Sequence, residues 1–249
     1  MATNQSGLDH VSVPVSILIG AVIIAVSILL AGIRISKAPA LAVGAAPTVA
    51  GQAAAKPTVQ NRTGDIKQVK TAGNPIIGSA SAPVVIAYWF DYQCPVCQRF
   101  EEQVMTQIKR DYIDTGKIRV VYKDLQFLGP DSQTLGLTAR AVWQLAPDKF
   151  VAWHKSLFDN QGRENSGWAT PDAIRKFSEP VLGADLTTKV MALAESNKTA
   201  FKTKMDADKS EGGTFGINAT PSFIIGSKVL VGLYPYETVK AAIDEALKK

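Results

Sequence analysis

The stretch PVVIAYWFDYQCPVC, residues 83–97, decides the fold. Its first eight residues, Pro83–Phe90, are apolar, β-branched or aromatic, which is typical of a buried central strand. The residues from Pro95 to about Tyr112 predict a helix, because Phe100, Val104 and Ile108 recur four residues apart on one face. The sequence therefore places a Cys-x-x-Cys pair where an apolar strand meets a helix.

Cys94 and Cys97 are the two cysteines of the chain, and their position predicts redox chemistry. Cys94 is expected at the N-cap of the helix, with Pro95 at the first helical position, where its missing N–H is tolerated. Free N–H groups and the positive end of the helix dipole then favour the thiolate and lower the pKa of Cys94. Cys97, one turn further along, is placed to attack a mixed disulfide formed on Cys94.

Two other interpretations of the cysteines are half of a zinc site and a pair of idle thiols. Structural zinc takes four Cys or His ligands, and His10 and His154 cannot complete such a set without dimerisation. No metal is therefore expected. His154 falls on a predicted amphipathic helix, and we interpret it as a surface or capping residue.

A second signal lies late in the chain, where Thr220-Pro221 precedes an apolar run. A proline that opens a strand is either an ordinary strand-edge residue in trans or part of a cis peptide bond. In the cis interpretation the loop packs against the cysteines and exposes backbone that can bind an extended substrate. Strands are predicted at Pro221–Ile225 and Lys228–Val231, joined through Gly226-Ser227 by a type II′ turn.

The remaining elements complete an α/β order. Residues 117–123 have strand composition, residues 132–210 show helical periods, and residues 235–247 predict a closing helix with Val239, Ala242, Ile243 and Ala246 inward. The predicted order is β-α-β, a helical block, then β-β-α.

The N-terminal part differs in composition. Residues 1–10 are polar, and residues 11–33 form an uncharged run long enough to cross a bilayer as a helix. Residues 34–64 contain an Ala- and Pro-rich stretch that we interpret as a linker. A cleaved signal peptide is the alternative, but the run is longer than usual and no Lys or Arg precedes it. Arg34 and Lys37 would favour a cytoplasmic C-terminal side, whereas the redox chemistry favours the outer side.

The net charge of +5 is modest, and lysines and arginines are scattered among acidic residues. We interpret them as a solvated surface. This pattern argues against a nucleic-acid partner.

Together these segments resemble the DsbA-like branch of the thioredoxin superfamily, in its membrane-anchored, single-domain bacterial form. The resemblance rests on five stretches: FDYQCPVCQRFEE, KIRVVYKDL, AWHKSLFDNQ, GINATPSFIIG and VGLYPYETVKAAIDEAL. It covers about residues 65–249 and implies a thioredoxin-like α/β fold with a helical insertion at about residues 131–210, preceded by the transmembrane helix and spacer.

The resemblance also implies roles for residues. Cys94 would be the attacking thiol, Cys97 the resolving thiol and Pro221 a cis-proline beside Thr220. The implied activity is thiol–disulfide exchange without a cofactor, most simply oxidation of exported proteins. A membrane redox partner would recycle the enzyme, and the domain would lie in the periplasm or outside the cell, tethered to the cell membrane by residues 11–33. Reductase or isomerase activity at the same site, and a tethered binding module without turnover, are the alternatives.

Three positions near the cysteines would tune the site, and two of them, Tyr88 and Val96, depart from the family pattern. Many relatives carry a carboxylate six residues before the first cysteine, where this chain has Tyr88. Asp91 matches a common acidic position. Val96 replaces the histidine of strongly oxidising relatives and adds no charge, so we expect a less oxidising enzyme.

Overall fold

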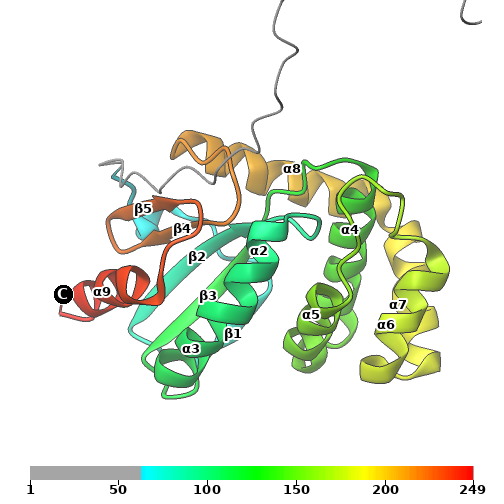
Figure 1. Cartoon of the computed structure of the whole chain (residues 1–249), viewed down its shortest axis with the longest axis horizontal. Helices are drawn as coiled ribbons and strands as arrows, with labels where there is room; N and C mark the ends of the chain where they lie inside the picture. The colour runs from blue at the N-terminus through cyan, green and yellow to red at the C-terminus, as the bar shows by residue number, and fades with distance from the viewer. Residues whose placement is uncertain (1–62, 249) are drawn as a thin grey trace, which may run out of the picture. The chain divides into compact units, whose positions relative to one another are not determined.

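The computed structural model describes residues 63–248, in which a five-stranded mixed sheet has the order β1-β3-β2-β4-β5 (Figure 1). The central strands β2 and β3 are parallel, and the other neighbours are antiparallel. The strand bounds are β1 Ile76–Gly78, β2 Val84–Phe90, β3 Ile118–Asp124, β4 Ser222–Ile225 and β5 Lys228–Val231. This confirms the predicted β-α-β and β-β-α halves. Strand β1 was not predicted, because three residues are too few to show an alternating pattern.

The side chains of β2 alternate between two separate cores. Tyr88 and Phe90 join the core under α2 and α9, while Ala87 and Trp89 join a smaller core on the opposite face. Since both faces of the strand are covered, its sequence is continuously apolar rather than alternating.

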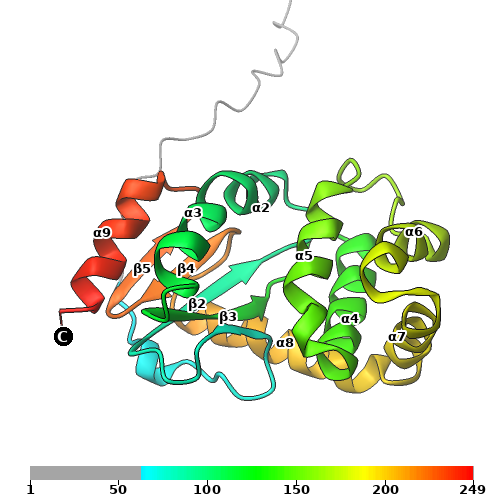
Figure 2. The same ribbon diagram turned by 90° about the horizontal axis from the view of Figure 1, so that it is seen from below.

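The helices fall into three groups (Figures 1 and 2). The first helical segment follows Cys94 and contains α2 Pro95–Phe100 and α3 Thr106–Ile108, joined and extended by wider π-helical turns at Glu101–Met105 and Lys109–Ile113. The insertion contains α4 Pro130–Leu145, α5 Phe150–Asp159, α6 Pro171–Leu182, α7 Ala184–Ser196 and α8 Lys198–Thr214. Short 3₁₀ turns occupy Ile66–Gln68 and Pro147–Lys149, and the last helix is α9 Tyr236–Ala246.

Helix α8 links the insertion to the sheet, because it packs against both α4 and β3 (Figure 2). Its buried residues Phe201, Met205, Asp208 and Gly212 form a stripe with helical spacing. Gly212 meets the ring of Trp89, where a Cβ atom would lie only 2.9 Å from the indole nitrogen. The same nitrogen donates a hydrogen bond to the carbonyl of Asp208 at 2.9 Å.

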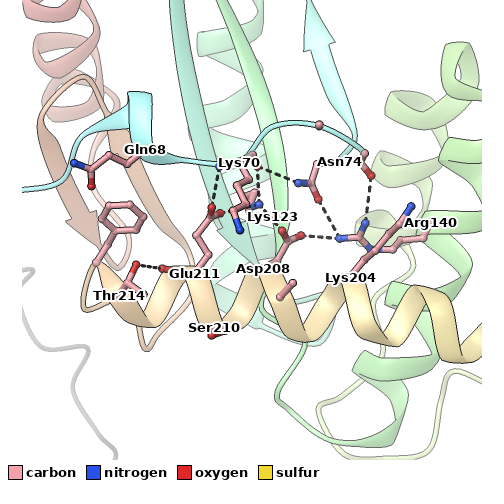
Figure 3. A pocket seen from close by; sticks show the side chains of 14 residues that line it. Gln68, Lys70, Asn74, Lys123, Arg140, Lys204, Asp208, Ser210, Glu211 and Thr214 are labelled. Carbon is pink, nitrogen blue, oxygen red and sulfur yellow. Dashed lines mark hydrogen bonds and ion pairs between the residues drawn. The ribbon is translucent and has the colours of Figure 1, made fainter.

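Five charged residues, which we call the ionic cluster, hold α8 to β3 and α4: the buried Lys123, Asp124, Arg140 and Asp208, and the half-buried Glu211. Figure 3 shows all of them except Asp124. Lys123 forms ion pairs with Asp208 and with Glu211, the latter at 2.9 Å. Arg140 contacts Asp124 and Asp208, each at 2.6 Å.

The interpretation of all basic residues as a solvated surface was therefore wrong for Lys123, which is 1% exposed, and for the buried Arg140. Burying a charge is tolerated when opposite charges surround it, and here those partners come from segments remote in sequence.

The predicted membrane helix at residues 11–33 and most of the linker lie outside the described residues. Two residues of the predicted linker are described and contact the β4–β5 hairpin: Thr63 pairs with Lys228, and the N–H of Gly64 donates to the carbonyl of Ser227. Within residues 63–248, no helix combines the length and the apolar character that a membrane crossing needs.

Candidate active site

The two cysteines lie at the N-terminus of α2, directly after the turn that follows β2. Cys94 is the N-cap residue with extended backbone (φ −72°, ψ 114°), and Pro95 occupies the first turn. The sulfur of Cys94 accepts a hydrogen bond from the backbone N–H of Cys97 at 3.4 Å. Both thiols are free, and Cys94 is 6% exposed whereas Cys97 is completely buried. Of the two cysteines, only Cys94 therefore has surface that a substrate can contact.

The surroundings give the two thiols opposite acidities. A hydrogen bond from the Cys97 thiol, helped by the Thr220 side chain and the N–H groups of Cys97 and Val96, lowers the pKa of Cys94 to about 6 despite partial burial. Burial, followed by the neighbouring Cys94 sulfur, raises the pKa of Cys97 well above its ordinary value. Between these two pKa values the pair therefore holds one negative charge, on Cys94.

The Thr220–Pro221 peptide bond is cis, which is the second of the two interpretations drawn from the sequence. In the thiol form, Sγ of Cys94 donates to the carbonyl of Thr220 at 3.5 Å. The loop is held from both sides, since Pro221 accepts a bond from Gly232 at 2.7 Å and Ser222 bonds Ala219 at 2.6 Å. The structure therefore brings Cys94, Cys97, Thr220 and Pro221 together at one point.

Asp91 is buried and organises the loops beside the cysteines. One carboxylate oxygen accepts bonds from the N–H of Gln93 and the hydroxyl of Ser132, and the other accepts from the N–H groups of Phe127 and Leu128. Burial raises the pKa of Asp91, and these bonds oppose the rise. Asp91 thus joins the turn before Cys94 to the segment that enters α4.

Tyr88 lies under the site, with its ring stacked on Phe223 at 4.8 Å and tilted against Phe100 at 5.4 Å. Its hydroxyl is buried and has no hydrogen-bond partner among the described residues. Burial, followed by the electrostatic influence of the nearby acidic groups of Cys97 and Glu101, raises the pKa of Tyr88 well above its ordinary value. A neutral phenol thus lies beneath the cysteine pair, at the position where the resemblance led us to look for a carboxylate.

Val96 is half-buried and packs against the main core. It places no formal charge beside Cys94, so the groups that lower the pKa of Cys94 are a thiol, a hydroxyl-bearing side chain and backbone N–H groups.

His154 is not on the surface, which corrects the interpretation drawn from the sequence. It is 2% exposed, and its ring nitrogens contact the hydroxyl of Tyr92 at 3.0 Å and the carboxylate of Glu101 at 3.1 Å. Aromatic rings surround it, including those of Phe90 and Tyr122. The amphipathic pattern of α5 did not reveal this, because the polar partners of His154 lie more than 50 residues earlier in the chain.

The glutamines Gln93 and Gln161 also belong to the site and were missed. Gln161, from the loop after α5, donates to the backbone carbonyl of Cys94 at 3.2 Å. No sequence motif indicated this contact, since the two residues are 67 positions apart.

The described residues, 63–248, contain no group of side chains suited to bind a metal ion. Among residues 63–248, no three or more His, Cys, Asp and Glu side chains are grouped to hold a metal ion. The pocket beside the ionic cluster has a volume of about 500 Å³, but its buried charges are engaged with one another and neither cysteine lines it (Figure 3).

Comparisons with known proteins agree with this geometry. The sequence profile of the family described as Thioredoxin matches residues 70–245. "Disulfide bond formation protein D" of Bacillus subtilis is 29% identical over 184 residues, which are 73% of this chain and 80% of that protein. A "Putative protein-disulfide oxidoreductase" of Rickettsia felis is 24% identical over 208 residues, 78% of this chain and 69% of the relative.

Solved structures show the same fold. The crystal structure of oxidised BdbD from Bacillus subtilis superimposes with a TM-score of 0.66 and 25% identity, covering 76% of this chain and all of that one. DsbA of Chlamydia trachomatis gives a TM-score of 0.63 at 19% identity, covering 71% of this chain and 93% of the other. The chain belongs to the thioredoxin family and is a DsbA-like thiol–disulfide oxidoreductase.

Proposed function

We propose that this oxidoreductase acts mainly as an oxidase, forming disulfide bonds in exported proteins through Cys94 and Cys97. The observation that carries the proposal is the asymmetry of the pair: the pKa of Cys94 is lowered to about 6 and this residue is 6% exposed, whereas Cys97 is completely buried and its pKa is raised. A stabilised thiolate favours the reduced enzyme and so makes its disulfide an oxidant.

The exchange proceeds in two displacements. A substrate thiolate attacks Sγ of Cys94 in the enzyme disulfide, forming a mixed disulfide and releasing Cys97 as a thiolate that takes up a proton. A second substrate thiolate then attacks the substrate sulfur of the mixed disulfide and expels Cys94 as a thiolate. The substrate dithiol loses two electrons, and the enzyme disulfide gains them and becomes the dithiol. The low pKa of Cys94 makes it the better leaving group in the second step.

Substrate binding is assigned to the loop at Thr220 and Pro221. The carbonyl of Thr220 lies 3.5 Å from the sulfur of Cys94, so backbone of this loop can bond an extended segment whose cysteine reaches that sulfur. Main-chain recognition accepts many sequences, which suits an enzyme with many protein substrates.

The reduced enzyme must be returned to its disulfide form. We assign this step to a membrane redox partner whose own disulfide is attacked by the Cys94 thiolate, after which Cys97 displaces the partner and leaves it as a dithiol. The proposal includes tethering by residues 11–33 and a catalytic domain on the extracytoplasmic side, where disulfides persist. The apolar length of residues 11–33 supports the tether.

Trapping tests the proposal. Cys97→Ala removes the resolving thiol, so mixed disulfides on Cys94 should accumulate on exported proteins and on one membrane protein. Cys94→Ser should abolish both trapping and turnover. Full activity of Cys94→Ser would overturn the exchange mechanism in favour of a binding role.

Whether the enzyme acts as an oxidase or as a reductase is tested separately, by equilibrating the protein with glutathione buffers. A reduction potential between those of thioredoxin, about −270 mV, and a strong oxidant, about −120 mV, is expected from the intermediate pKa of Cys94. A value at or below the thioredoxin potential would indicate a reductase.

A further inference from the structure

The loop between α5 and α6, residues 160–170, lies against the turn that precedes Cys94. The side-chain amide of Gln161 donates to the backbone carbonyl of Tyr92 at 2.8 Å and to that of Cys94 at 3.2 Å. One side chain of the insertion thus holds the carbonyl groups on both sides of Gln93.

The contact is reciprocal, because Gln93 reaches back into the insertion. Its side-chain oxygen accepts a bond from the N–H of Asn165 at 2.8 Å, and its amide nitrogen donates to Leu128 at 2.6 Å and Ser132 at 3.1 Å. Gln93 is completely buried, and Asn165 has a left-handed backbone (φ 56°). We call Gln93 and Gln161 the glutamine clasp.

The clasp acts on the part of the backbone that aims the sulfur. As the N-cap residue, Cys94 must keep an extended ψ of 114° while its carbonyl accepts the first helical bond, from Gln98 at 3.2 Å. A rotation of the turn at residues 92–94 would move the Cys94 sulfur away from the N–H of Cys97. Because Gln161 binds the carbonyls of both Tyr92 and Cys94, it opposes that rotation.

We propose that Gln161 is a positioning residue for disulfide exchange, which holds the turn before Cys94 so that its sulfur stays aligned with the N-terminus of α2. The inference rests on the role of Cys94 in the proposed function. If Gln161 has this role, the loop at residues 160–170 of the helical insertion controls the reactivity of Cys94.

The test compares two glutamines that both bridge the catalytic segment to the insertion. Gln161→Met removes the amide that holds residues 92 and 94. Gln98→Met is the matched control, because Gln98 donates from α2 to the carbonyl of Phe158 at 2.8 Å, a comparable contact that does not touch those two carbonyls. The reduced proteins are titrated by the ultraviolet absorbance of the thiolate, and the rate of reaction with a small disulfide is measured across pH.

Loss of one hydrogen-bonded restraint should raise the apparent pKa of Cys94 by roughly 0.4–1 unit in Gln161→Met. The rate at about pH 5 should then fall by roughly 2.5- to 10-fold, while the rate above about pH 8 stays within a factor of two. Gln98→Met should keep the wild-type titration even if it unfolds at lower temperature. A variant that is merely unstable would lose rate equally at all pH values.

A second variant guards against misfolding. Gln161→Glu keeps the shape of the side chain but replaces the donating nitrogen with an acceptor, and it should raise the pKa at least as much. The inference is overturned if the folded Gln161 variants titrate like wild type, or if Gln98→Met shifts the titration equally. Failure of the proposed function is recognised separately, as persistent exchange by Cys94→Ser in the same assay.

Discussion

The catalytic turn and the ionic cluster use electrostatics in opposite ways. The ionic cluster holds five formal charges, and each is matched by an opposite charge on a neighbouring segment. The catalytic turn stabilises one charge, on Cys94, by means of a thiol, the Thr220 side chain and backbone N–H groups, without a charged side chain. The paired charges of the ionic cluster hold α8, β3 and α4 together. The thiolate of Cys94 is stabilised only by dipoles and has no charged partner, so it remains able to react.

The comparison also shows that cavity size does not locate the chemistry. The pocket of about 500 Å³ belongs to the ionic cluster, whose groups are already engaged (Figure 3). The reactive sulfur lies instead at a barely exposed point between α2 and the Thr220–Pro221 loop. An enzyme that acts on protein chains needs one accessible atom rather than an enclosing cavity.

The first prediction separates the two regions by stability. Lys123→Met leaves Glu211 without its cation and leaves Asp208 paired with Arg140 alone, which should lower the free energy of unfolding by about 3–5 kcal/mol while the pKa of Cys94 stays where it is. Urea unfolding and thiolate titration measure the two quantities. Lys202→Met is the control, since its ion pair with Asp206 on the same helix is exposed and should contribute less than about 1 kcal/mol. A shifted Cys94 titration in Lys123→Met would show that the regions are coupled.

The second prediction concerns pH and the reduced protein. The pKa of Cys94 is lower in the folded than in the unfolded chain, so its stabilising contribution is complete above the ordinary thiol pKa and is lost as the pH falls through about 6. Between about pH 6 and 8.5 the reduced form should therefore gain up to about 3 kcal/mol of stability relative to the disulfide form. Above that window the raised pKa of Cys97 opposes the gain. Unfolding of both forms across pH checks this, and a constant difference would contradict it.

The third prediction tests the contacts that His154 makes with the catalytic segment. His154→Phe keeps an aromatic ring but leaves Tyr92 and Glu101 without their partner, which should lower the free energy of unfolding by about 1–3 kcal/mol. Glu101→Gln keeps an oxygen that can accept from His154 and should have a smaller effect. Thermal unfolding measures the stability of both variants. If Glu101→Gln loses as much stability as His154→Phe, the charge of Glu101 rather than the hydrogen bonds of His154 accounts for the effect.

The fourth prediction places a cationic side chain beside Cys94, where the catalytic turn has none. Val96→His should lower the pKa of Cys94 by about half to one unit when the imidazole is protonated, and raise the reduction potential by roughly 15–30 mV. Equilibrium with glutathione measures the potential. Val96→Ala should leave it unchanged, and a similar shift in that control would attribute the effect to packing.

The catalytic strand, the cysteines and the Thr220–Pro221 loop could be predicted because their signals are local. Strand β2 is a continuous apolar run, and the Cys-x-x-Cys spacing itself places the N-cap. The hairpin turn has a positive φ at Gly226 alone of its two central residues, as the predicted type II′ turn requires. In each case the residues that cause the structure stand beside one another in the chain.

The supporting residues could not be predicted because their partners are remote. Lys123 resembles any strand-end lysine until α8 brings Asp208 against it. His154 and Gln161 follow ordinary helical and loop patterns. Their partners Glu101 and Cys94 reach them only when α5 and the loop after it fold against the catalytic segment. Periodicity reports which face of an element is buried, but it does not report which polar group will meet it.

Helix α8 imposes a constraint on chain length. Its inward stripe, from Phe201 through Asp208 to Gly212, must match the indole of Trp89 and the cations of β3 and α4 at the same time. Adding or deleting one residue between Phe201 and Asp208 would turn the two ends of the stripe by about 100° relative to each other. Side chains on the exposed face of α8 are not bound by this register, whereas it fixes the number of residues between Phe201 and Gly212.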